Sequence, residues 1–146
     1  MANSLKGFTL LEVLLSLAIL ALLAGLSAPV YLNLQSRNDL AVATTTLAQT
    51  LRRAQTLAMA VASDSTWGVK VQTGNFTLFK GLGYSARDPS FDEIFDLPSN
   101  LISSGPSEII FSKFTGEPQT TGNITLTNVN NENRTLSVSP KGMISY

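Results

Sequence analysis

The residues that could carry chemistry in this sequence are carboxylates, amines and hydroxyls, because histidine and cysteine are both absent. Without histidine the chain has no ordinary general base at neutral pH and lacks the commonest transition-metal ligand. Neither a Ser-His-Asp nor a Cys-His catalytic site can be built from this sequence, and a disulfide framework is excluded. We therefore expect no catalytic residues, no cofactor and no bound metal.

One carboxylate stands out by its surroundings. Glu12 is the single charged residue of an apolar run that begins at Phe8 and reaches Pro29, and the next charge is Arg37. An acidic residue at the centre of a membrane helix costs roughly 2.5–3.5 kcal/mol on insertion scales, and less near one end of the helix. Two interpretations stay open: a side chain that reaches the lipid head groups, or a carboxylate whose partner charge comes from outside this segment.

The apolar run is long enough to cross a bilayer as a helix. Residues 8–29 match the roughly 20 residues that a membrane-spanning helix needs. The preceding residues 1–7 form a short polar leader with one charge, Lys6, which by the positive-inside rule keeps the N-terminus cytoplasmic. A secretory signal peptide cleaved near residues 25–27 is the alternative, but its apolar core is normally about 7–15 residues, and it leaves Glu12 without a role.

A second helical pattern follows the apolar run. Residues 30–62 are predicted to be an amphipathic continuation of the helix, whose apolar stripe covers a sheet. Pro29 is expected to perturb the helix, which otherwise runs nearly unbroken from Phe8 to about Ala62. The residues of the stripe recur at spacings of three, four and seven: Leu40, Leu47, Leu51, Ala54, Ala58 and Val61.

From residue 63 to residue 146 the apolar period changes to two, which predicts an antiparallel β domain. The segment 81–106 is interpreted as loops, and the chain as a whole as an α+β protein with a long N-terminal helix packed on that β domain. The strand patterns comprise a hairpin at 67–80 and further strands at 108–112, 122–127, 134–139 and 143–146.

Two groups of charges in these regions have a functional and a structural interpretation. The first is a group of four acidic residues between positions 88 and 96. Oxygen-rich clusters can bind calcium, but the spacing of these acidic residues matches no calcium loop, and a solvated acidic loop is favoured. Arg52 and Arg53 lie off the helical stripe and favour a solvated helix face over a nucleic-acid patch. The acidic group consists of Asp88, Asp92, Glu93 and Asp96.

The heptapeptide from Gly7 to Val13, Gly-Phe-Thr-Leu-Leu-Glu-Val, resembles the prepilin processing motif of type IV pilins and type II secretion pseudopilins. The resemblance implies a pilin-like fold and cleavage by a prepilin peptidase between Gly7 and Phe8, followed by N-methylation of Phe8. It also implies that Glu12 pairs with the N-terminal ammonium of a neighbouring subunit during assembly.

The C-terminal half sharpens the resemblance. The segments 109–112, with Gly116 after it, 123–127 with 134–139, and 139–144 resemble the minor-pilin class that joins type II secretion H pseudopilins with FimT-like pilins. The resemblance implies a structural subunit of a type IV pilus or a secretion pseudopilus, whose partners are other pilin or pseudopilin subunits and an inner-membrane assembly platform. It implies a single-pass inner-membrane protein with its C-terminal domain outside, and later an extracytoplasmic filament.

A FimT-like minor pilin that binds DNA during uptake is the alternative. Lys plus Arg and Asp plus Glu both number 10, so the chain has no net pull towards nucleic acid. Beyond Lys113 the only cations are Arg134 and Lys141, whereas binding to phosphates needs several cationic contacts. We therefore do not expect nucleic acid as a partner.

Overall fold

The computed structural model describes residues 7–146, and for residues 26–30 it describes the backbone alone. Apart from Gly7, the predicted leader at residues 1–7 lies outside the described residues. The chain divides into two compact units, one ending at Gln35 and one running from Ser36 to Tyr146, and each is described by itself.

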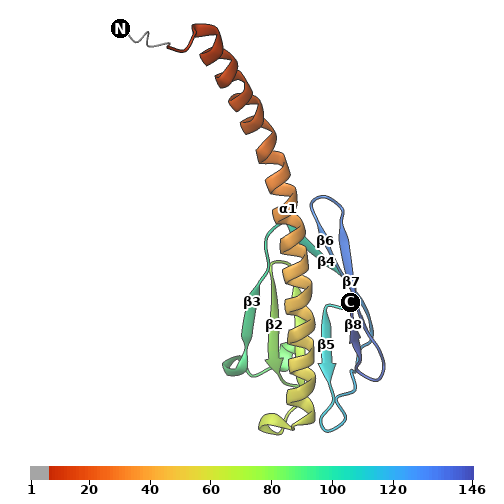
Figure 1. Cartoon of the computed structure of the whole chain (residues 1–146). Helices are drawn as coiled ribbons and strands as arrows, with labels where there is room; N and C mark the ends of the chain where they lie inside the picture. The colour runs from red at the N-terminus through yellow and green to blue at the C-terminus, as the bar shows by residue number, and fades with distance from the viewer. Residues whose placement is uncertain (1–6) are drawn as a thin grey trace. The chain divides into compact units, whose positions relative to one another are not determined.

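Helix α1 spans Leu10–Met59 and contributes to both units (Figure 1). Its 50 residues correspond to about 75 Å at 1.5 Å per residue. Pro29 was expected to perturb the helix, but the backbone is helical there, and the alternative of one nearly unbroken helix describes α1. Among the described residues, no helix is both long and apolar enough to cross a membrane. The membrane-crossing role of residues 8–29 therefore stays a prediction.

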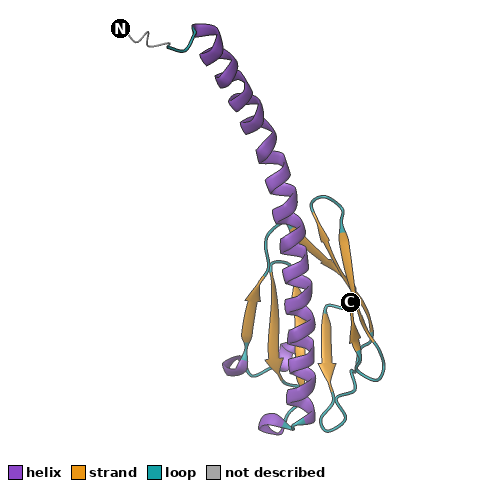
Figure 2. Ribbon diagram, in the orientation of Figure 1, coloured by secondary structure: helices purple, strands orange, loops and turns teal. Residues whose placement is uncertain are grey.

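The part of the chain after α1 forms two four-stranded antiparallel sheets (Figure 2). The first sheet has the strand order β3-β2-β1-β5, and the second has the order β4-β6-β7-β8. The strands are β1 (Trp67–Gln72), β2 (Asn75–Lys80), β3 (Glu93–Asp96), β4 (Leu101–Ser104), β5 (Glu108–Phe111), β6 (Gly122–Asn128), β7 (Asn133–Val138) and β8 (Ile144–Ser145). One short 3-10 helix, Ala62–Asp64, precedes β1, and two more, Tyr84–Ala86 and Pro89–Phe91, lie between β2 and β3.

The core of the 36–146 unit lies between the second half of α1 and the two sheets. The predicted helical stripe is confirmed from Leu40 to Ala58, whereas Val61 is only half-buried. The hydroxyls of Thr44 and Thr50 are buried beside this stripe, and each donates to the carbonyl four residues earlier, so that burial leaves neither hydroxyl unpaired. The sheets contribute Val69, Val71, Phe76, Leu78, Ile109, Phe111, Ile124, Leu126, Leu136 and Val138.

The hairpins follow the sequence pattern closely. Strands β1 and β2 pair from Trp67 with Lys80 to Gln72 with Asn75, as the predicted hairpin at 67–80 requires. In β6 and β7 the apolar residues face the core and the threonines face outward, where Thr125 and Thr135 lie with their hydroxyl oxygens 3.0 Å apart. The prediction of a half-buried antiparallel pair is confirmed.

The prediction of loops throughout 81–106 is wrong at two places. Strands β3 and β4 lie within this segment, and they are the edge strands of the first and second sheets respectively. Each has four residues; β4 buries only Leu101, and β3 has no fully buried residue. A strand with so few inward-facing apolar residues produces almost no period-two signal.

The segment between β2 and β3 folds over the outer face of the first sheet. There the rings of Phe79 and Tyr84 meet edge to face, with their centroids 5.5 Å apart. Gly68 lies beneath Phe79, and a β-carbon at this position would approach the Cζ atom of Phe79 to 2.6 Å. A glycine in β1 is therefore what allows Phe79 to pack flat on the sheet and position the polar residues that follow.

Candidate functional site

The N-terminal segment places its candidate residues at the start of a helix. Residues 7–9 are exposed and non-helical, and α1 begins at Leu10. The hydroxyl oxygen of Thr9 accepts a hydrogen bond from the backbone N–H of Glu12 over 3.3 Å, and the Thr9 carbonyl accepts from Val13 over 3.2 Å. Thr9 therefore caps the helix, with Glu12 in the third helical position.

This arrangement brings the predicted site residues Gly7, Phe8 and Glu12 into one short segment. The Gly7–Phe8 peptide bond lies in exposed, non-helical backbone, the state that a protease needs. Glu12 lies in the first turn, where the positive end of the helix dipole stabilises a carboxylate. Within the described residues, the carboxylate of Glu12 makes no hydrogen bond or ion pair, so any partner for it must come from elsewhere.

The helix around this segment is apolar on every side. Phe8 is 81% exposed, and the large apolar side chains between residues 10 and 23 are all at least 45% exposed. An apolar surface of this extent marks a site that another apolar surface covers. The residues are Leu10, Leu11, Val13, Leu14, Leu15, Leu17, Ile19, Leu20, Leu22 and Leu23.

Thr9 is the residue of this site whose role the sequence interpretation missed. It was recognised as part of the heptapeptide only, although the spacing of Thr9 and Glu12 is itself the sequence signature of a helix start. The motif therefore has a structural component, the cap, beside the two residues at the predicted cleavage site.

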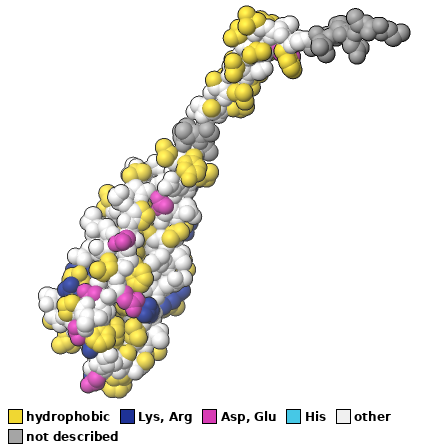
Figure 3. Space-filling view, turned by 90° about the vertical axis from the view of Figure 1, so that its left-hand side faces the viewer, with side chains coloured by type: hydrophobic (Ala, Val, Ile, Leu, Met, Phe, Trp, Pro, Cys, Tyr) yellow, Lys and Arg dark blue, Asp and Glu magenta, His cyan; other side chains and the backbone are white. Residues whose placement is uncertain are grey.

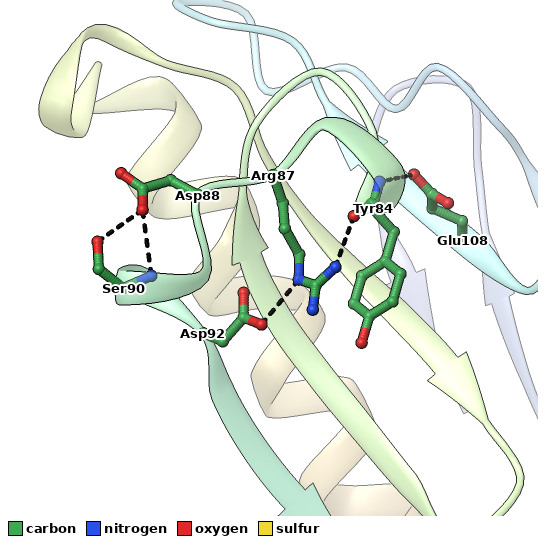
Figure 4. A network of polar contacts seen from close by, with 6 residues as sticks. All are labelled: Tyr84, Arg87, Asp88, Ser90, Asp92 and Glu108. Atoms are coloured by element: carbon green, nitrogen blue, oxygen red, sulfur yellow. Dashed lines mark hydrogen bonds and ion pairs between the residues drawn. The ribbon is translucent and has the colours of Figure 1, made fainter.

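The acidic group at residues 88–96 serves local structure (Figure 4). The guanidinium of Arg87 donates to Asp92 Oδ2 over 2.7 Å and to the Tyr84 carbonyl over 2.9 Å, and it stacks over the Tyr84 ring at 3.8 Å. The backbone N–H of Tyr84 donates to Glu108 Oε1 over 2.8 Å. These contacts fasten the segment between β2 and β3 to strand β5.

The remaining acids have partners or stand apart. Asp88 accepts from the hydroxyl and the backbone N–H of Ser90, and both hydrogen bonds lower the pKa of its carboxyl. Among the described residues no three potential metal ligands gather at one place. The expectation of a solvated acidic loop is only partly met, because Glu93 and Asp96 lie in β3 and the side chain of Asp92 is only 11% exposed.

Arg52 and Arg53 reach opposite edges of the fold. Arg53 makes a two-pronged contact with the carboxylate of Glu93 in β3, at 2.6 and 2.7 Å. Arg52 donates to the Ile144 carbonyl in β8 over 3.2 Å and lies over the ring of Tyr146. These adjacent arginines hold one edge strand of each sheet to α1.

Comparison with known proteins supports the interpretation of the N-terminus. The model of the prokaryotic N-terminal methylation motif matches residues 3–28. No curated protein matches the chain. The matched range contains Gly7, Phe8 and Glu12.

Comparison of structures concerns the fold of most of the chain. The minor pseudopilin EpsH from the type 2 secretion system of Vibrio cholerae aligns with a TM-score of 0.56 and 13% sequence identity, covering 73% of this chain and 94% of EpsH. At this identity the likeness shows the fold, a long N-terminal helix packed on antiparallel sheets. The chain therefore carries an N-terminal methylation motif, and its fold is similar to that of a minor pseudopilin.

Proposed function

We propose that this chain is a structural subunit of a type IV pilus or a type II secretion pseudopilus, assembled through its apolar N-terminal helix. The observation that carries the proposal is the apolar surface of residues 10–23, exposed on all sides of α1 behind a methylation motif. A helix that is apolar all round needs an apolar environment, which packed helices in a filament core provide. The role is structural and assigns no residue to catalysis.

Maturation is the first step of the proposed role. A prepilin peptidase cuts between Gly7 and Phe8, and Phe8 becomes the methylated N-terminal residue. Residues 1–7 are the leader, 8–29 the membrane and assembly segment, 30–62 its amphipathic continuation and 63–146 the β domain. The chain is held in the inner membrane with its N-terminus cytoplasmic and its β domain outside, before an assembly platform transfers it to an extracytoplasmic filament.

Glu12 has a defined role in this assembly. Cleavage creates an ammonium at Phe8, which is largely protonated at neutral pH. In an apolar filament core an isolated carboxylate and an isolated ammonium are each costly, whereas a pair of the two offsets much of that cost. We therefore assign Glu12 to the ammonium of a neighbouring subunit, which is consistent with its lack of a partner among the described residues.

Two matched glycine variants test the processing step. Gly7→Leu removes the small residue before the predicted cleavage site, and Gly25→Leu makes the same change beside the alternative signal-peptide site. We expect Gly7→Leu to leave the chain unprocessed when the prepilin peptidase is present, and Gly25→Leu to be processed normally. Cleavage of Gly7→Leu together with failure of Gly25→Leu would favour the secretory signal peptide and contradict the proposal. Immunoblots of membrane fractions give the readout.

A further inference from the structure

Two side chains of the 36–146 unit, Asp96 and Arg134, make no hydrogen bond, ion pair or ring contact in this fully described part of the chain. Every other charged side chain of this unit has such a partner, so these two are the exceptions. They have opposite charge. Because one side chain of each sign is left without a partner inside this unit, the two can meet between molecules.

Asp96 and Arg134 lie on opposite sides of α1. Asp96 ends strand β3 and lines a crevice with Val42 and its neighbours on the helix. Arg134 lies in strand β7 and lines a second crevice with Arg37. At 100° per residue, Arg37 and Val42 point about 140° apart around the helix axis. Figure 1 shows β3 on one side of α1 and the β6–β7 hairpin on the other.

The two sides differ in charge. We call the crevice of Asp96 the acidic flank; Asp39 is its second carboxylate, and no cation lines it. In Figure 3, which faces the β3 side, the uppermost part of the body shows acidic and no basic side chains. We call the crevice of Arg134 the basic flank, where Arg37 and Arg134 face a single carboxylate, Glu132, at 2.7 Å from Arg37.

The flanks also match in apolar shape. The acidic flank is a crevice of about 180 Å³ whose walls include Phe76, Val42 and Leu97, and Val42 is 55% exposed. Beside the basic flank, the turn between β6 and β7 exposes 69% of Val129. An exposed aliphatic side chain next to the basic flank and the apolar walls of the acidic flank are of complementary chemistry.

We infer that the basic flank of one copy of this chain binds the acidic flank of the next copy, with Arg134 of one subunit pairing with Asp96 of its neighbour. The inference rests on the proposed filament function and names the lateral contact of that filament. Because the two surfaces differ, the contact is head-to-tail; such a contact repeats from subunit to subunit, as a filament requires, instead of closing into a two-fold dimer. An exposed ion pair adds little affinity, so its contribution is to fix the register of the subunits.

Cysteine crosslinking of the full chain in cell membranes tests the contact. The natural sequence has no cysteine, so only the introduced cysteines of this chain can react. A double variant, Asp96→Cys with Arg134→Cys, treated with a short thiol-reactive crosslinker, should give a ladder of multimers. Each single variant alone should give no product, and a mixture of the two single variants should give dimers only. Asp96→Cys with Lys141→Cys is the matched control, since Lys141 is an exposed cation in a different part of the fold, and it should give no ladder.

The alternatives predict different bands. Dimers from either single variant would mean a symmetric contact and would overturn the inference. Products containing a different, pilin-sized chain and no ladder would also overturn it, because the neighbour would not be a second copy. If the double variant is cleaved at Gly7–Phe8 and enters filaments but gives no ladder, the inference fails while the proposed function stands. If the natural chain itself is neither cleaved nor found in filaments, the proposed function fails.

Charge reversal gives a second measurement that does not depend on crosslinking geometry. Arg134→Glu and Asp96→Lys should each lower the amount of chain in filaments several-fold, relative to the processed pool in the membrane. The variant carrying both changes should recover most of that loss, because the pairing is restored with reversed sign. Recovery is not expected from misfolded protein, so failure of the double variant to recover would contradict the pairing.

Discussion

Gln55 on helix α1 donates from its Nε2 atom to the carbonyl oxygen of Gly116 over 3.0 Å, and Gly142 lies against the same amide. One side chain thus joins α1 to the segment before β6 and to the turn before β8. Gly116 and Gly142 have φ angles of 63° and 78°, in the left-handed region that glycine adopts readily. A β-carbon on Gly116 would approach the Met59 side chain to 2.6 Å, so each glycine is needed for its conformation and for close approach to the helix.

Gly142→Ala should lower the free energy of unfolding by about 1–3 kcal/mol, because it adds both backbone strain and a clash with the amide of Gln55. Gly74→Ala is the control: Gly74 also has a positive φ, 90°, but a β-carbon there would meet no atom within 4 Å. We expect a smaller loss of unfolding free energy for Gly74→Ala, and the difference between the two losses measures the contribution of the clash. Urea denaturation of a fragment starting at residue 30 measures both, and equal losses would show that contact with Gln55 contributes nothing.

Leu51→Asp should destabilise the same fragment strongly. Leu51 is fully buried between α1 and the sheets, so the substitution places a carboxylate in the core without a partner. We expect a loss of about 3–5 kcal/mol, enough to unfold a domain of marginal stability. Val42→Asp, on an exposed face of the same helix, should change the melting temperature much less. An unchanged melt for Leu51→Asp, followed by circular dichroism, would mean that the stripe is not core.

Below pH 8, the pH dependence of stability should come mainly from carboxyl groups. A hydrogen bond and the charge of Lys113 lower the pKa of Asp64, and hydrogen bonds from Ser90 lower that of Asp88. Both carboxyls thus titrate in the folded state below the roughly 3.9 of an unfolded chain. Their stabilisation is fully present above that value and is lost as pH falls through the lower folded pKa. With no histidine in the chain, no side chain of ordinary pKa titrates between pH 5 and 8.

Asp64→Asn tests the contribution of the Lys113 pair. The asparagine side chain tolerates the left-handed backbone of residue 64, where φ is 51°, and it has no proton to gain in acid. Denaturation midpoints of this variant should fall less between pH 5 and pH 2 than those of the natural chain. If the midpoints of Asp64→Asn fell more steeply than those of the natural chain, the carboxylate of Asp64 would not stabilise the fold above its pKa, and the prediction would be wrong.

The sequence predicted the elements whose signal is long or strictly periodic. The stripe from Leu40 to Ala58, the β1–β2 hairpin and the β6–β7 pair all repeat over several residues, and each lies where the pattern placed it. Strand β3 could not be recognised from the sequence. It has only two apolar residues, which lie between Glu93 and Asp96, so that its composition resembled that of a loop. Its place in the first sheet depends on pairing with β2 and on the reach of Arg53, which are contacts between distant parts of the chain.

Some of the functional residues could likewise be predicted from the sequence, and others could not. Gly7, Phe8 and Glu12 could be identified from the sequence because their chemistry is local: a small residue, a new N-terminus and a carboxylate at fixed spacing. Asp96 and Arg134 could not, because what distinguishes them is the absence of a partner in the folded 36–146 unit. Each is an ordinary surface charge until the neighbours that could pair with it are known.

Glu12→Gln should impair assembly while leaving maturation intact. The substitution removes the charge but keeps the shape, and neither cleavage nor membrane insertion requires the ion pair with a neighbouring ammonium. We expect normal processing at Gly7–Phe8 and a several-fold smaller fraction of the processed chain in sheared filaments. A carboxylate that only reaches lipid head groups predicts the opposite, because a neutral side chain is easier to hold in an apolar environment. Natural levels of incorporation would reject the pairing role.

The most direct measurement of the central claim is the intact mass of the chain recovered from filaments sheared from the cells that produce it. The account predicts a single species that begins at Phe8 and carries one added methyl group on its N-terminal amine. A chain that retains residues 1–7, a chain that begins near Ala28, or the absence of the chain from the filament fraction would contradict it.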